Sequence, residues 1–386
     1  PGVAPMVGVR PDADWVVPDA CVAEASAVGN GAIHPVGRLD QLVEALNGVS
    51  AWPEPMPVTD AAPVVDEPDL ADVRGQPCGR RALEVAAAGG HHLLFVGPPG
   101  AGKTMLARRL PGLLPDLDPD GALGATMVHS AAGLPLPPGG LLTRPPFRAP
   151  HHSSSPGSLV GGGSHQLRPG EASLAHAGVL FLDELGQFNP RALDGLREAL
   201  ESGHVLVGRV EQERVPMPAR FQLVAATNPC PCGGGAPGAC ECDERSRQRY
   251  LGRLSGPLLD RFDLRIVLQR PEVDDLFDGG SGESSAAVAA RVATARRLAF
   301  ERSGCLNAQL GERLLGEVAR PTGAADRRLR EQLEAGRLTA RGLDRVRRVA
   351  RTLADLDGAT DLIDTDHVET ALALRSRLGA AMVVQA

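Results

Sequence analysis

The stretch that decides the fold runs from residue 97 to residue 104 and reads Gly97-Pro98-Pro99-Gly100-Ala101-Gly102-Lys103-Thr104. It fits the pattern GxxxxGK[ST] and predicts a phosphate-binding loop, in which backbone N–H groups surround phosphate oxygens. Lys103 is the only lysine in a chain that has 39 arginines. A general preference for arginine explains why lysine is rare, but not why the one lysine stands where a flexible ammonium must reach phosphates.

The sequence on either side of this loop supplies the strand and the helix that such a loop needs. Residues 92–96 are a short apolar run, typical of a buried parallel strand, and residues 103–110 favour a helix. Further buried strands are expected at residues 178–182, 221–226 and 264–268, and Asn189-Pro190 is a typical helix start. This alternation predicts an α/β fold, a parallel sheet with helices on both faces. Beyond residue 285 the pattern is helical.

Polar residues follow two of the expected strands. Asp183 and Glu184 end the run 179–182, and we expect Asp183 to hold Mg²⁺ together with Thr104, while Glu184 polarises a water molecule. An acidic pair alone is weak evidence, since helices often begin with acids. Asn228 follows the run 221–226 and could orient the same water or simply form a turn with Pro229, and both can be true.

Arg261 stands between apolar residues and a strand, in Leu258-Leu259-Asp260-Arg261-Phe262-Asp263. An arginine supplied from an adjacent subunit could stabilise the charge of a phosphoryl-transfer transition state. From the pattern alone, an internal salt bridge to Asp260 or Asp263 is the better expectation.

Four cysteines lie within thirteen residues, in the spacing C-x-C-x₇-C-x-C. Four thiolates could bind a structural Zn²⁺ and hold the loop after Asn228, although the spacing is tighter than the usual C-x₂₋₄-C. Free thiols or redox chemistry are the alternatives. The four residues are Cys230, Cys232, Cys240 and Cys242.

The remaining cysteines and the histidines of the middle region carry no metal template. Cys21, Cys78 and Cys305 are isolated and are expected only to pack. Four histidines of this region have Gly, Ser and Pro as neighbours, so we expect a loop role rather than metal binding. They are His151, His152, His165 and His176.

Together these motifs resemble AAA+ ATPases, and more specifically the magnesium-chelatase-like ComM/YifB family. The resemblance rests on residues 97–104 and on the segments 146–153, 178–185, 228–233 and 255–261. It implies Walker A at 97–104, Walker B at 179–184, Asn228 as sensor 1, Arg261 as arginine finger, and Arg341, within Thr339-Ala340-Arg341, as sensor 2. ATP and Mg²⁺ are the implied cofactors, and residues 72–76 resemble the segment that lines the adenine pocket.

The family also implies a partner and an assembly. The expected form is a homo-hexameric ring that moves branched or single-stranded DNA, including branch migration. Residues 144–163 match the helix-2 insert and residues 205–218 a hairpin before sensor 1. Glu211 and Glu213 would repel phosphates at the hairpin tip, so nearby arginines are better candidates for DNA contact: Arg209, Arg214, Arg144 and Arg148. For each of them, the alternative of an ordinary solvated surface arginine is given equal weight.

The chain of 386 residues is long enough for several domains. We expect a remnant of a Lon-protease-like domain at 1–50, a Pro-rich linker at 51–68, the AAA+ core at 69–270, a linker at 271–285 and a helical lid domain at 286–386. The resemblance implies a Lon-protease-like domain before the ATPase, of which only the last part is expected here, and the start at Pro1 rather than Met agrees with a truncated chain. Lon-type proteolysis is not expected, because it needs a lysine beside its serine and Lys103 is committed to phosphate.

Composition limits the class of partner. The net charge is −7, so contacts with nucleic acid must be local, and residues 320–351 hold ten arginines against four acids. Without an apolar span or a signal peptide, the sequence predicts a cytoplasmic protein without membrane contact. Two rival functions stay open: the ATPase subunit of a magnesium-chelatase-type complex, and a regulatory ATPase that drives no movement.

Overall fold

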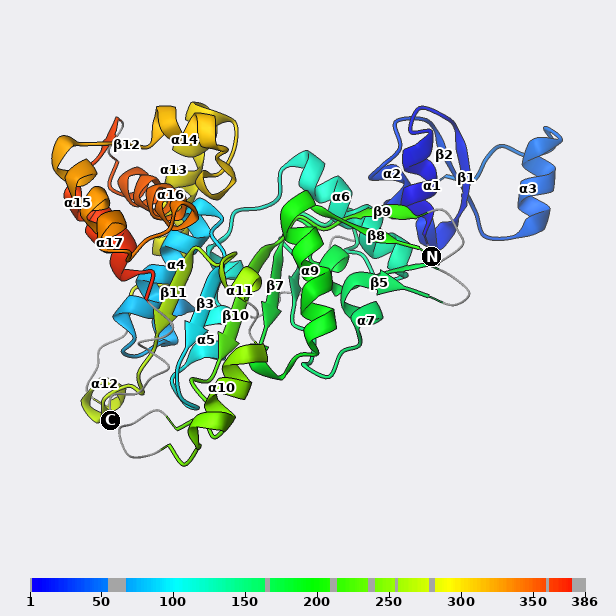
Figure 1. Cartoon of the computed structure of the whole chain (residues 1–386). Coiled ribbons are helices and arrows are strands. Elements are labelled where there is room, and N and C mark those ends of the chain that lie inside the picture. The colour runs from blue at the N-terminus through cyan, green and yellow to red at the C-terminus, as the bar shows by residue number, and fades with distance from the viewer. Residues whose placement is uncertain are drawn as a thin grey trace.

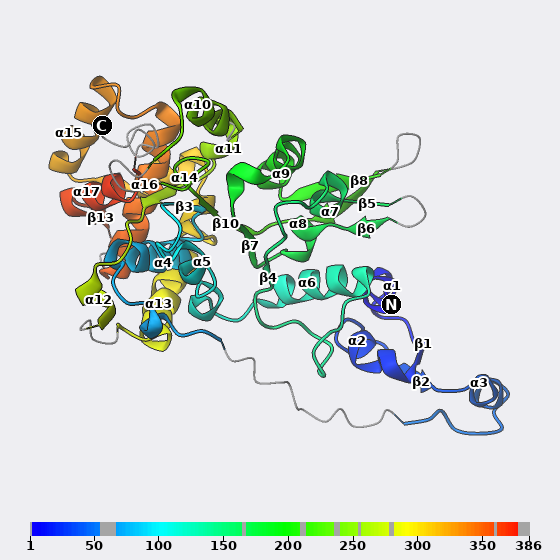
Figure 2. The same ribbon diagram turned by 90° about the horizontal axis from the view of Figure 1, so that it is seen from below.

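The centre of the computed structural model is a five-stranded parallel sheet with the strand order β11-β3-β10-β7-β4 (Figures 1 and 2). The structure describes residues 2–54, 67–163, 167–208, 214–234, 240–253, 256–277, 282–358 and 361–376. The strands are β3 (Leu93–Val96), β4 (Phe147–Arg148), β7 (Val179–Leu182), β10 (Gln222–Thr227) and β11 (Leu264–Val267). Four of them coincide with the predicted runs. The edge strand β4 was not expected, because two residues give no periodic signal.

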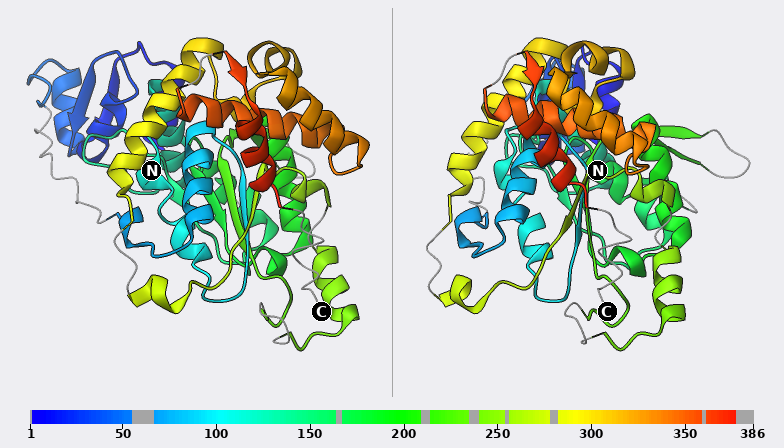
Figure 3. Two further views of the ribbon diagram at one scale, coloured as in Figure 1. Left: turned by 90° about the vertical axis from the view of Figure 1, so that its left-hand side faces the viewer. Right: turned by 60° about the vertical axis from the view of Figure 1, so that its left-hand side comes forward.

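Helices cover both faces of this sheet, as the sequence predicted. Side chains alternate along β3, so Leu93 and Phe95 enter one apolar core while Leu94 and Val96 enter the other. The first core includes α4 (Pro77–Gly89), α5 (Lys103–Ala107) and α13 (Ser285–Ser303), and the second includes α7 (Pro156–Val160), α8 (Glu171–Leu174) and α9 (Pro190–Ser202). Figure 3 shows the two layers on opposite sides of the strands.

The carboxyl-terminal helices form a bundle against the first core (Figure 1). Val346, Val349 and Leu353 are buried in that core, and the helices agree with the helical pattern predicted beyond residue 285. The elements are α14 (Glu312–Val318), β12 (Arg320–Pro321), α15 (Gly323–Glu334), α16 (Ala340–Leu356), β13 (Leu362–Ile363) and α17 (Thr365–Ala373), with a 3₁₀ turn η5 (Asn307–Gln309).

Residues 2–50 form a small module beside α6 (Pro119–Ala132), visible in Figure 2. The backbone N–H of Ala4 donates to Glu24 and Ser130, and Leu123 and Met127 of α6 pack on the module's core. Its parallel strands are β1 and β2, and its assignment to a Lon-like domain stays a prediction. The elements are α1 (Val3–Val9), β1 (Trp15–Pro18), η1 (Asp19–Cys21), α2 (Val22–Ser26), β2 (Ile33–Val36) and α3 (Leu39–Leu46).

Two antiparallel hairpins project from the second face and lie side by side (Figure 2). One pairs β5 (Gly161–Gly162) with β6 (Arg168–Pro169), and the other pairs β8 (His204–Val207) with β9 (Val215–Pro218). A Cβ on Gly161 would meet the Val207 side chain at 2.8 Å, so the hairpins are in contact. The remaining elements are η2 (Leu70–Asp72), η3 (Pro111–Leu113), η4 (Leu185–Gln187), α10 (Glu244–Arg253), α11 (Gly256–Leu259) and α12 (Val273–Phe277).

Candidate active site

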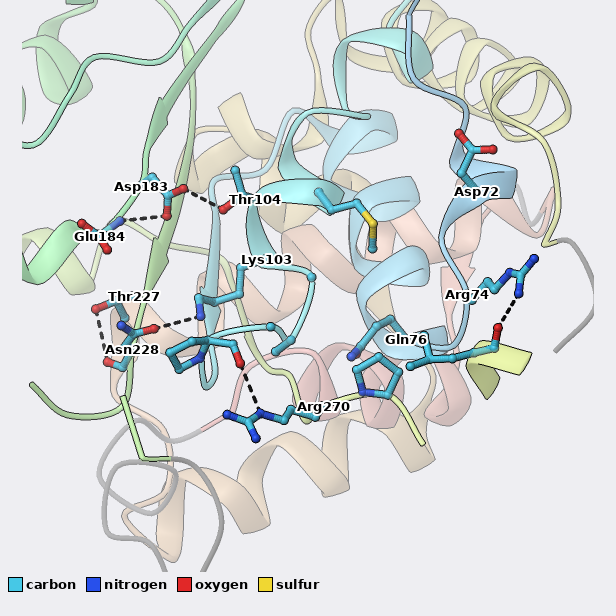
Figure 4. A pocket seen from close by; sticks show the side chains of 17 residues that line it. Asp72, Arg74, Gln76, Lys103, Thr104, Asp183, Glu184, Thr227, Asn228 and Arg270 are labelled. Atoms are coloured by element: carbon cyan, nitrogen blue, oxygen red, sulfur yellow. Dashed lines mark hydrogen bonds between the residues drawn. The ribbon is translucent and has the colours of Figure 1, made fainter. Parts of the chain in front are cut away.

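Lys103 lies at the start of α5, directly after the glycine loop that follows β3 (Figure 4). The loop turns here because Gly100 and Gly102 have φ values of 81° and 83°, in the left-handed region that favours glycine. The Lys103 ammonium is buried and donates to the carbonyls of Gly97 (2.6 Å) and Pro98 (2.9 Å) and to Asn228 Oδ1 (2.9 Å). Burial lowers the pKa of Lys103, while the carboxylates of Asp183 and Glu184 oppose that shift.

Thr104 and Asp183, the two residues expected to hold Mg²⁺, are in direct contact. The hydroxyl of Thr104 donates to Asp183 Oδ2 at 2.6 Å, although 79 residues separate them in the chain. They meet because α5 and the end of β7 reach the same edge of the sheet (Figure 4). A hydroxyl and a carboxylate oxygen are hard ligands that fit Mg²⁺, and the remaining positions would come from phosphate and water.

Glu184 stands next to this pair in a strained conformation. Its φ of 53° is unusual for a residue with a side chain, and its N–H donates to Asp183 Oδ1 at 2.9 Å. Its carboxylate lies 3.2 Å from Nδ1 of His152, on the loop that follows β4. The sequence offered no sign of this contact, because only the unexpected pairing of β4 with β7 brings residues 152 and 184 together.

A cavity of about 720 Å³ joins these residues, which is an ordinary size for a small-molecule site. It is lined by the phosphate loop, Asp183, Glu184 and Asn228, and at its far end by Asp72, Arg74 and Gln76 (Figure 4). The last three belong to the segment expected at an adenine. Arg270 is a lining residue that the sequence analysis missed, and its Nε donates to the Pro99 carbonyl at 3.2 Å.

Arg261 and Arg341 do not line this cavity. Arg261 forms an ion pair with Glu201, so the expected bridges to Asp260 or Asp263 are wrong. Those two acids are taken by other arginines, because Arg265 pairs with Asp260 and Arg345 with Asp263. Burial lowers the pKa of Arg261, and the nearby guanidinium groups of Arg345, Arg341 and Arg197 add to the shift.

Arg341 and Arg345 lie one turn apart near the start of α16, and Arg345 also donates to the Arg261 carbonyl at 3.1 Å. Arg261 and Arg341 therefore belong to one cationic cluster, which lies outside the nucleotide-sized cavity of its own chain.

The four arginines that were expected to contact DNA differ in their surroundings. Arg144 is paired with Glu67 and Asp116, and Arg148 forms a two-bond ion pair with Glu171. Arg214 is exposed on the β8–β9 hairpin, whereas Arg209 lies outside the described residues, as do Glu211 and Glu213.

The four cysteines after Asn228 come together, and among the described residues they are the only group of this kind with metal-binding spacing. His151 bonds to Ser153 and His176 accepts from the Arg220 N–H, in keeping with loop roles; His165 lies outside the described residues. Cys78 is exposed rather than packed.

Comparison with known proteins gives a consistent result. Residues 69–276 match the family model described as magnesium chelatase, subunit ChlI, and residues 282–375 match the model of its C-terminal part. The chain is 47% identical over 381 residues to an uncharacterized protein of Mycobacterium tuberculosis, covering 97% of this chain and 75% of the relative. It is 44% identical over 340 residues to YifB of Escherichia coli (88% and 66%) and 41% identical over 361 residues to the competence protein ComM of Haemophilus influenzae (92% and 70%).

Among the described residues, no helix combines the length and the apolar character that a membrane span needs.

Proposed function

Because the chain belongs to the magnesium-chelatase-like family of AAA+ ATPases that includes YifB and ComM, we propose that it hydrolyses ATP as a ring and uses the energy to move DNA. The observation that carries the ATPase part is the convergence of Lys103, Thr104 and Asp183 on one cavity. Mg²⁺ and ATP are the cofactors that these groups fit.

In this proposal each residue of the cavity has a separate task. Lys103 and the loop N–H groups bind the β and γ phosphates, and Thr104 with Asp183 holds Mg²⁺, which neutralises phosphate charge. Glu184 takes the proton of the attacking water, and Asn228 orients that water. Since Asn228 already contacts the Lys103 ammonium at 2.9 Å, it is in reach of a terminal phosphate held there.

The cationic cluster of Arg261 and Arg341 makes assembly part of the mechanism. Neither residue lines the cavity of its own chain, so we propose that both act on the nucleotide of a neighbouring subunit. A head-to-tail interface that closes into a ring brings one subunit's cluster to the next subunit's cavity, and a hexamer is the proposed size.

Two observations support DNA as the substrate: the pair of hairpins and the name of one relative. The β5–β6 and β8–β9 hairpins project side by side and carry exposed Arg168 and Arg214. One relative is named a competence protein, and competence is the uptake of DNA by cells. Arg144 and Arg148 are weaker candidates for DNA contact than the sequence suggested, because intrachain carboxylates already neutralise them.

The test is the ATPase rate with and without a four-way DNA junction. We expect the junction to raise turnover several-fold in the wild type, and we expect a Arg168→Ala/Arg214→Ala variant to keep the basal rate and lose most of the stimulation. Arg313→Ala, at an exposed lid arginine, is the matched control and should behave as wild type.

Two outcomes would contradict the DNA proposal. Stimulation only by a partner subunit of a metal chelatase would favour the chelatase function, which the family description supports. Hydrolysis that responds to neither addition would favour a regulatory ATPase.

A further inference from the structure

Four thiols come together in the loop that follows Asn228. The Sγ atoms of Cys230, Cys232 and Cys240 are separated by 3.4, 3.5 and 3.7 Å, and all four sulfur atoms, with that of Cys242, lie within 4.8 Å of one another. A disulfide would need a separation of about 2.05 Å, which none of these pairs has. Four sulfurs placed tetrahedrally 2.3 Å from a zinc ion are about 3.8 Å apart, close to the distances here.

The surroundings of the cluster suit thiolates. The N–H of Gly234 donates to Cys232 Sγ at 3.3 Å, and a hydrogen bond to sulfur stabilises its charged form. Cys230 is buried whereas Cys232 is exposed, so the site has an inner wall and an open side through which an ion can enter. The short C-x-C spacing within each pair is no obstacle, because the sulfur atoms of both pairs still lie within 4.8 Å of one another.

Both arms are tied to residues beside Asn228. On the first arm, the Gly233 N–H donates to the Cys230 carbonyl at 3.1 Å, and the backbone of Gly233 lies so close to the Pro99 ring that a Cβ there would meet it at 2.8 Å. Pro99 belongs to the phosphate loop. On the second arm, Cys242 leads directly into α10, whose Tyr250 hydroxyl hydrogen-bonds to Thr227 Oγ1 at 2.9 Å. Thr227 is the fully buried residue immediately before Asn228.

We propose that Cys230, Cys232, Cys240 and Cys242 bind one Zn²⁺ as a tetrathiolate, and that this ion holds Asn228 and Pro99 in their places at the nucleotide. Binding exchanges four thiol protons for one metal ion, with no change of oxidation state. Because the two arms contact Pro99 and, through Tyr250, Thr227, we expect loss of the ion to loosen the surroundings of Asn228. The predicted consequence for turnover rests on the proposed ATPase function, whereas the metal site itself does not.

The first test is metal content. Protein purified with reductant and without chelator should contain about one zinc per chain, measured by inductively coupled plasma mass spectrometry. Cys232→Ser, at an exposed position, should lose most of this zinc, and Cys78→Ser, at an exposed cysteine away from the cluster, should keep it. Replacement of zinc by Co²⁺ should give the intense visible absorption of a tetrahedral cobalt thiolate, which does not depend on any variant folding.

The second test separates the metal from hydrolysis. In Cys232→Ser we expect kcat for ATP to fall about tenfold while nucleotide affinity changes less than about threefold, because Lys103 stays fixed by α5 and by its bonds to the Gly97 and Pro98 carbonyls. Wild type without zinc and without a cobalt spectrum would overturn the site, as would a disulfide between any two of the four cysteines in reduced protein. Loss of zinc with unchanged kcat in Cys232→Ser would overturn the role at Asn228, and full zinc in that variant would overturn Cys232 as a ligand. Full zinc in a wild type that hydrolyses no ATP would instead overturn the proposed function and leave the site standing.

Discussion

At the scale of single residues, the contact between His152 and Glu184 is the most informative feature that the sequence did not reveal. Glu184 is the proposed base, and its backbone is already strained, so the direction of its carboxylate depends on what holds it. His152 is the side chain that does so at 3.2 Å, and it does not itself line the cavity. It is therefore a positioning residue rather than a catalytic one.

The variant His152→Ala tests this assignment. We expect kcat for ATP to fall about tenfold, because the base loses its orientation, while KM stays within about twofold. His151→Ala removes the neighbouring imidazole, which bonds to Ser153 instead, and should leave both constants unchanged. Equal effects of the two substitutions would show that turnover depends on the loop as a whole and not on the contact between His152 and Glu184.

At the scale of elements, the joint between α16 and the sheet depends on a buried ion pair. Arg345 of α16 donates to Asp263 at 2.5 Å, immediately before β11, and only 4% of the Asp263 side chain is exposed. His91 lies on the other side of the same carboxylate at 3.4 Å. The pair connects the helical bundle to the segment that carries Arg261.

Arg345→Ala should therefore lower the stability of the fold. Removal of one partner leaves a buried carboxylate short of its cation, and we expect the free energy of unfolding to fall by about 3 kcal/mol, measured as a lower urea midpoint. Arg330→Ala removes an exposed pair with Asp326 and should cost less than about 0.5 kcal/mol. A similar midpoint for the two variants would argue against a structural role for the buried pair.

At the scale of the whole molecule, the separation of the cationic cluster from the cavity predicts shared active sites. Lys103→Ala should abolish ATP binding but leave Arg261 intact, and Arg261→Ala should bind ATP without turning it over. Mixed rings of the two contain interfaces with an intact cavity and an intact Arg261, so random assembly should restore up to about a quarter of wild-type activity.

The control for this mixing experiment is a chain that can supply neither part. Lys103→Ala mixed with the Lys103→Ala/Arg261→Ala double variant should stay inactive. If Arg261→Ala alone keeps normal turnover, Arg261 is only the ion-pair partner of Glu201.

The sequence by itself determined the sheet and the groups at its edge. Four strands were visible as apolar runs, because strands buried on both faces must be apolar throughout. The glycine loop after the first of them marked Lys103 and Thr104, and the acids and the amide after two others marked Asp183, Glu184 and Asn228. Parallel strands end at one edge, so residues far apart in the chain were bound to meet there.

Only the tertiary structure decided the contacts that local pattern cannot encode. The two-residue strand β4 is too short for a periodic signal, yet its pairing with β7 brings His152 to Glu184. Arg261 had acids beside it in sequence but pairs with Glu201 of α9, since side-chain partners depend on which surfaces pack together. In the same way, the convergence of four thiols from two arms of one loop follows from how β10 and α10 are anchored, and the spacing of the cysteines alone left it open.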